Sequence, residues 1–191
     1  MSLRPVFRYR VDGREITCVD EELRRELLAR RHEDQRIRTL VSPPRGEHAV
    51  RLPDEVAAQW QRTDEDNTRW LGEVLSAKGW PGRTLAGEDG AAAAWLLAQH
   101  ADHDSVRQRA FLDALHGAVD QGEASPAYLA YLEDRVRVHA GQPQLYGTQF
   151  TVTGGEFGPH PIEDPQRLDE RRASAGLEPF ADYEARMRAP S

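Results

Sequence analysis

The stretch AAAAWLLAQHADHDSVRQ, residues 91–108, decides the fold because it joins two helical segments through a few polar residues. Its apolar side chains recur at the spacing of one helical face, which predicts a helix over about 91–103. Asp104 or Ser105 can cap the next helix, and Ser105 and Gln108 have the spacing of a capping box. Helices joined by so short a connection pack side by side, so the stretch indicates a helical core.

Outward from this stretch, helical periodicity and helix-end signals continue through most of the chain. A proline at a helix start and a glycine just past its end are typical boundaries. Helices are expected at 21–40, from Pro53 to Gly79, from the 104–105 cap to Gly122, and from Ser125-Pro126 to Gly141. The glycine-rich residues 82–90 are expected to form a turn, and residues 42–52 a loop.

Two pairs of short β-branched and aromatic runs predict β-hairpins outside this helical region. VFRYRV and REITCV flank Asp12-Gly13, and QLYGTQFTVT and EFG flank Gly154-Gly155. Short helices are expected at 164–176 and 179–187. The fold class is therefore mainly α, with about five to seven helices and one or two small β-hairpins. We expect one domain over 1–191, made of a hairpin appendage (1–19), a helical core (20–141), and a hairpin with short helices (142–191).

Composition excludes several classes of protein. The chain has 25 Lys and Arg against 32 Asp and Glu, a formal net charge of −7, so we expect no nucleic-acid partner. No stretch approaches the roughly 20 apolar residues of a membrane span, so no membrane partner is expected. The single cysteine, Cys18, indicates a reducing compartment, and the first residues lack the apolar run of a signal peptide. A cytoplasmic location is expected.

Four helices carry a polar residue in the middle of the apolar face that should enter the core. These residues are Asp34, Asn67, Gln99 and Arg135. A buried charge or amide needs a partner, so one interpretation is a structural network in which Asp34 pairs with Arg135. The other is a polar cavity that receives a ligand, because folding alone seldom requires so many buried polar groups.

The segment Gln99-His100-Ala101-Asp102-His103-Asp104 concentrates titratable side chains at a helix end. His100 is the natural general acid or base, with Asp34, Asp102 or Asp134 as the carboxylate that orients it. The alternative is that these residues only cap helix ends. His100 and His103 have an i,i+3 spacing that could bind a metal with His139 or His160, but seven histidines produce such pairs by chance. We expect no metal and no cofactor.

The segment 144–149, QLYGTQ, is polar for a strand beside a hairpin. Tyr146, Gln144 and Gln149 offer a hydroxyl and two amides that suit a small polar ligand. Gly147 allows a ligand or another backbone to approach closely. Strand alternation would send Tyr146 and Gln149 to opposite faces unless a bulge intervenes.

Several of these motifs together resemble a bacterial family of unknown function. They are WLLAQHAD at 95–102, Asp134-Arg135 and QLYGTQ at 144–149, and the similarity extends from about residue 20 to residue 185. The resemblance implies no activity. It does imply that the unusual polar residues belong to one constellation, as the periodicity of the helices also suggests.

The leading hypothesis is an enzyme that acts on a small polar metabolite by acid–base chemistry, as a lyase, isomerase, cyclase or hydrolase. His100 would transfer the proton, with Asp34 or Asp102 orienting it, and Arg135 would bind an anionic group. The substrate-positioning residues would be Gln99, Asn67, Gln144, Tyr146 and Gln149. A binding or regulatory module with the same cavity, and a purely structural interaction protein, are the alternatives.

Overall fold

The protein is a helical bundle with two small hairpins, seen in a computed structural model that describes residues 8–11, 14–17, 19–41 and 53–189. Seven α-helices are present in these ranges, with a 3-10 turn at Pro165–Arg167. They are α1 (Glu21–Val41), α2 (Asp54–Lys78), α3 (Arg83–Gln99), α4 (Ser105–Asp120), α5 (Pro126–His139), α6 (Leu168–Ser174) and α7 (Phe180–Arg188). The mainly α fold is confirmed.

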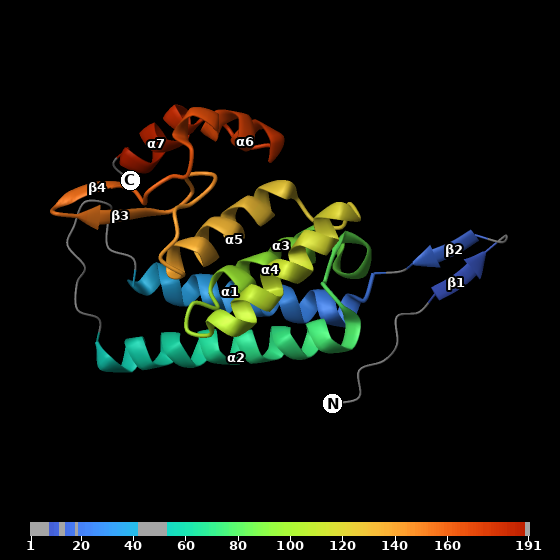
Figure 1. The fold of residues 1–191 in the computed structure, drawn as a ribbon. Coiled ribbons are helices and arrows are strands. Elements are labelled where there is room, and N and C mark those ends of the chain that lie inside the picture. Colours follow the sequence, from blue (N-terminus) through green and yellow to red (C-terminus); the bar gives the residue numbers. More distant parts are fainter. Residues whose placement is uncertain (1–7, 12–13, 18, 42–52, 190–191) are drawn as a thin grey trace.

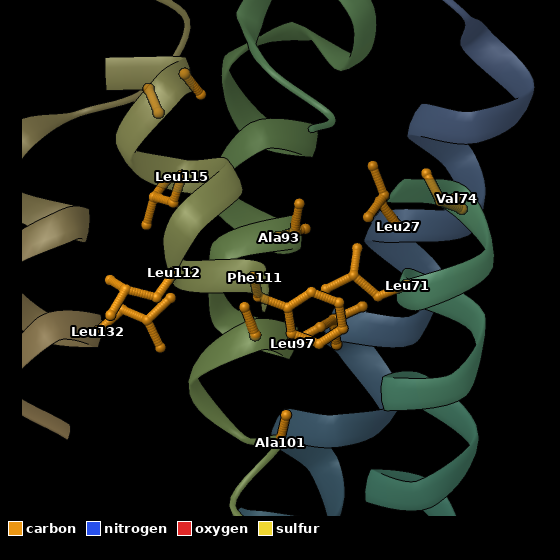
Figure 2. Packing of buried hydrophobic residues seen from close by; sticks show 14 of the residues in the cluster. Leu27, Leu71, Val74, Ala93, Leu97, Ala101, Phe111, Leu112, Leu115 and Leu132 are labelled. Atoms are coloured by element: carbon orange, nitrogen blue, oxygen red, sulfur yellow. The ribbon is translucent and has the colours of Figure 1, made fainter. Parts of the chain in front are cut away.

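The helices form layers in Figure 1, with α2 on one side, α1, α3 and α4 in the middle, and α5 next. The C-terminal elements lie beyond α5. The core lies among α1 to α5, where Leu27, Leu71, Leu97 and Leu115 are almost completely buried (Figure 2). Full burial of one such side chain contributes about 1.5–3 kcal/mol. The apolar faces of the five long helices therefore hold the bundle together.

The helix ends follow local capping chemistry. The Asp104 carboxylate accepts a hydrogen bond from the Arg107 backbone N–H at 2.9 Å, so Asp104 is the cap of α4. The alternative cap at Ser105 is wrong. Ser125 caps α5 through the backbone N–H of Ala127, with a proline at the first helical position.

Residues 82–90 are the main departure from the expected elements. Gly82 directly precedes α3, and residues 83–90 form the first part of this helix, which bends at Gly87, where φ is 72°. Gly90 is buried, and a Cβ there would lie 2.9 Å from the Ala86 Cβ, so glycine supplies close packing rather than a turn. At its other end α3 stops at Gln99, with His100 as the residue that follows the helix.

The described residues form two antiparallel hairpins, β1 (Arg8–Val11) with β2 (Arg14–Thr17) and β3 (Phe150–Thr153) with β4 (Glu156–Pro159). Figure 1 shows β1 and β2 standing clear of the helices. The expected Asp12-Gly13 turn, Cys18 and the loop 42–52 lie outside the described residues. Residues 145–149 precede β3 but do not belong to a strand. None of the helices in the described part of the chain is long and apolar enough to cross a membrane.

Candidate functional site

His100 and Asp34 form a carboxylate–imidazole pair between the end of α3 and the middle of α1. Nδ1 of His100 lies 2.9 Å from Oδ1 and 3.0 Å from Oδ2 of Asp34. The Asp34 side chain is 1% exposed, whereas His100 keeps 15% of its side chain exposed. An ionised carboxylate can only accept, so Nδ1 carries the hydrogen and Nε2 is left as the proton-exchanging nitrogen.

Arg38 links this pair to a second carboxylate on α2. Its Nε donates to Asp34 at 3.2 Å, and its Nη2 donates to both oxygens of Asp64 at 2.9 and 3.0 Å. Trp60 donates its indole N–H to Asp64 at 2.8 Å and lies under the Arg38 guanidinium, 4.9 Å from its ring centre. Gln35 donates to Asp34 at 2.8 Å. The imidazole therefore rests on a network that ties α1, α2 and α3 together.

The two carboxylates of this network have pKa values that shift in opposite directions. Burial opposes ionisation of Asp34, but the hydrogen bond and charge of His100, with Arg38 and Gln35, more than offset it, so the Asp34 pKa is lowered. Burial raises the pKa of Asp64, the Asp34 charge adds to the rise, and Arg38 offsets it only in part. Such a divergence is common where carboxylates take different roles in acid–base chemistry.

Asp102 and Arg135 form a separate cluster on the α5 side of the turn after α3. Arg135 donates to Asp102 through both Nε, at 2.7 Å, and Nη2. Gln108 donates to Asp102 at 2.9 Å, and His139 lies 3.5 Å from it. The expected pairing of Asp34 with Arg135 is therefore wrong, because Asp34 binds His100 and Arg135 binds Asp102, two different residues of the turn after α3. Asp102 does not orient His100, and the Arg135 charge is already neutralised, which leaves it a poor anion clamp.

Gln99 is buried, as periodicity predicts, and its backbone carbonyl accepts a hydrogen bond from the Gln108 side chain at 3.1 Å. Its side chain is 5% exposed, and its Nε2 has no hydrogen-bond partner among the described residues. The indole Nε1 of Trp95, one turn earlier on α3, is likewise buried and without a partner there. An unpaired buried donor costs about 1–3 kcal/mol.

Asn67 is also buried, at 5% exposed, on the α1-facing side of α2. Its Oδ1 accepts a hydrogen bond from Arg30 at 3.0 Å, while Nδ2 has no partner in the described part of the chain. A surface groove of about 380 Å³ between α1 and α2 reaches it. The structure does not bring Asn67 into contact with His100, so its place among substrate-binding residues stays a prediction.

The segment 144–149 is folded around the carboxylate of Asp134, which is completely buried on α5. This carboxylate accepts hydrogen bonds from the backbone N–H groups of Leu145 (2.6 Å), Tyr146 (3.0 Å) and Thr148 (2.9 Å), and from the Thr148 hydroxyl (3.0 Å). Burial raises the pKa of Asp134, although these donors oppose the rise. Because the N–H groups turn toward one point, the segment cannot continue as a strand.

Three further side chains hold the carbonyl groups of the same segment. Arg171, Arg172 and Tyr183 donate to carbonyl oxygens within 144–149 at 2.7, 2.5 and 3.1 Å. Arg172 is 1% exposed and lies over the Tyr183 ring at 4.9 Å from its centre. These backbone groups of the loop are therefore already hydrogen-bonded within the protein, so a ligand would contact the side chains of the loop.

The amides of this segment serve its own structure. Gln144 is fully buried, donates to the backbone carbonyls of Gln149 and His160 at 3.0 and 2.9 Å, and accepts from the Gln149 N–H at 2.8 Å. We therefore no longer place Gln144 against a substrate. Gln149 donates its side-chain amide to a neighbouring threonine at 3.0 Å. Gly147 has a φ of 69°, and a Cβ there would lie 2.8 Å from the Phe180 ring, so an aromatic side chain approaches it rather than a ligand.

Sequence reasoning did not assign Arg38, Asp64 or Trp60 to the site. The only local signal was spacing, since Asp34 and Arg38 are four residues apart, as are Trp60 and Asp64. Within the described ranges no group of three or more His, Cys, Asp or Glu side chains is arranged to hold a metal ion.

A family model described as a family of unknown function (DUF6624) matches residues 21–189. The chain belongs to this family. The match includes all seven α-helices, the candidate site and the loop around Asp134, and it begins after the N-terminal hairpin. No curated protein and no solved structure matches the chain. The family thus supplies no activity.

Proposed function

We propose that the protein is an enzyme that acts on a small polar metabolite by general acid–base chemistry at His100. The observation that carries the proposal is the hydrogen bond between His100 Nδ1 and the buried Asp34 carboxylate. A carboxylate behind an imidazole fixes its tautomer and orientation and stabilises the protonated ring. The ring also remains partly exposed, so a substrate could reach Nε2.

Each residue of the network has a distinct role in this proposal. His100 takes up and returns a proton at Nε2, and Asp34 orients the ring and balances its charge. Arg38 holds Asp34 in place through its second partner, Asp64, and the stacked Trp60 restricts the guanidinium. Asp102 and Arg135 have no part in proton transfer, because they neutralise each other on another side of the turn.

The reaction class stays open among lyase, isomerase, cyclase and hydrolase, and a screen can search all four. The purified protein is incubated with pools of polar metabolites in D₂O, and ¹H NMR follows both conversion and loss of C–H signals. General acid–base catalysis contributes about 10²–10⁴-fold to a rate. His100→Asn should therefore lower turnover by about a hundredfold or more. The matched control is His116→Asn, because His116 is exposed and its contact with Glu133 spans 3.4 Å.

The screen also tests the alternative of a binding module. Saturable binding of a metabolite without turnover, equal in the wild type and in His100→Asn, would favour a non-catalytic ligand-binding protein. Turnover that survives His100→Asn would refute the role of His100.

A further inference from the structure

Gln99 and Trp95 place two unused N–H donors in the last turns of α3, just before His100 in the chain. They are four residues apart, so their side chains project from neighbouring turns of one helical face. Both donor atoms are buried, and neither has a hydrogen-bond partner among the residues that the structure describes. Gln99 directly precedes His100 in the chain. Unused buried donors are rare in native proteins, and a group that receives them from outside is a common explanation.

The Trp95 indole lies among aromatic side chains of α5. The Trp95 ring stacks on Tyr128 with ring centres 4.3 Å apart and meets Tyr131 edge-on at 6.0 Å. The nearby arginine on α5, Arg135, is already bound to a carboxylate. Arg135 is thus not free to bind a carboxylate or phosphate, whereas amide and indole N–H groups are suitable donors for a neutral oxygen.

We infer that Gln99 and Trp95 bind the carbonyl oxygen of a neutral substrate beside His100. The inference rests on the proposed function and gives it a substrate class, uncharged carbonyl compounds such as amides and ketones. When His100 removes a proton from the carbon next to this carbonyl, the C–H electron pair forms a C=C bond and the carbonyl oxygen takes the negative charge. N–H donors aimed at that oxygen stabilise the charge as it develops. In a substrate with a C=C bond next to that carbon, return of the proton from His100 to the far end of this C=C bond gives the conjugated isomer and regenerates the carbonyl group.

The inference is tested with two small probes of the same shape, acetamide and acetate. They are titrated into ¹⁵N-labelled protein while the indole N–H and side-chain amide signals are followed by NMR. Trp95→Phe and Gln99→Met remove the donors at similar bulk and assign the two signals. The matched control is Trp80→Phe, because the Trp80 indole N–H is also buried without a partner in the described residues but lies before the start of α3.

Acetamide should shift the Trp95 and Gln99 signals together with one dissociation constant, and acetate should bind more weakly. Gln99→Met should weaken acetamide binding by about fivefold, the loss of one neutral hydrogen bond. Trp80→Phe should leave it within about a factor of two. Equal binding of the two probes, no shift of the two signals, or unchanged binding in Gln99→Met would overturn the inference.

Two further measurements keep the test independent of folding and of catalysis. Gln99→Met removes an unpaired buried donor, so its melting temperature should equal or exceed that of the wild type. A clear decrease would mean that the amide has a structural partner, which also overturns the inference. His100→Asn should leave acetamide binding intact. If the probes fail to bind but turnover still depends on His100, only the carbonyl site is refuted. If acetamide binds as expected but no His100-dependent turnover is found, only the catalytic proposal is refuted.

Discussion

Replacement of Asp134 by asparagine probes the loop 144–149, the part of the family motif that the structure explains most completely. The carboxylate accepts from three backbone N–H groups and one hydroxyl; the hydrogen bonds from Thr148 are buried, and those from Leu145 and Tyr146 are partly buried. Asp134→Asn keeps the shape but replaces one acceptor oxygen with an NH₂ group that faces other donors. Whichever way the amide turns, at least one backbone N–H, that of Leu145 or that of Thr148, faces the new NH₂ group, so two donors are left without an acceptor.

The cost follows from these contacts. Each buried donor left unpaired costs about 1–3 kcal/mol, and small backbone shifts recover part of it, so we expect a loss of about 3–5 kcal/mol. For a domain of this size 1 kcal/mol corresponds to roughly 2–4 °C, which predicts a decrease in melting temperature of about 6–20 °C.

Thermal unfolding followed by circular dichroism measures this decrease, and urea titration gives the free energy of unfolding. The matched control is Asp113→Asn, an exposed carboxylate on α4 that should change stability by less than about 0.5 kcal/mol. Hydrogen exchange should show faster exchange of the amides that Asp134 binds. A melting temperature within about 2 °C of the wild type would refute the reasoning, because the two unpaired donors must then have found other acceptors.

Three further results are expected. The pKa of Asp34 is lowered, so folding favours its ionised form; the stability that this carboxylate contributes is present above its unfolded-state pKa and is lost as the pH falls through the lower folded value. The difference in unfolding free energy between the wild type and Asp34→Asn should therefore persist down to about pH 5 and close below about pH 4. A difference that grows in acid would contradict this. Gly147→Ala should lower the free energy of unfolding, measured by urea titration, by about 2–4 kcal/mol, because a left-handed φ and the Phe180 ring both oppose the new Cβ. Gly141→Ala, with the same φ of 69° and nothing within 4 Å of the new Cβ, should lower it by only about 1–2 kcal/mol. Equal losses of stability in the two variants would refute the steric argument. Arg135→Met should lower the melting temperature by no more than about 4 °C, because its ion pair with Asp102 is partly exposed, and a larger decrease in a thermal scan would show that the pair is shielded from solvent.

The sequence alone determined where most helices begin and end, because these boundaries depend on residues a few positions apart. Ser125 and Pro126 start α5, and the glycine at 79 ends α2, as their local chemistry predicts. Periodicity also showed that Asp34 and Gln99 enter the core, and both are buried. The same periodicity predicted that Arg135 is buried, which is wrong, because 26% of its side chain is exposed.

Only the tertiary structure decided which of these polar groups meet. Asp34 and His100 are 66 residues apart, and their contact depends on how α1 packs against α3, which no local pattern records. The same holds for Asp102, which a two-residue spacing places near His100 in the chain but which faces α5 and Arg135 in the fold. A helical period tells which side chains are removed from water, but their partners are set by helix packing. For that reason the candidate site consists of His100 and Asp34 with Arg38 and Asp64, while the polar segment 144–149 is organised by Asp134.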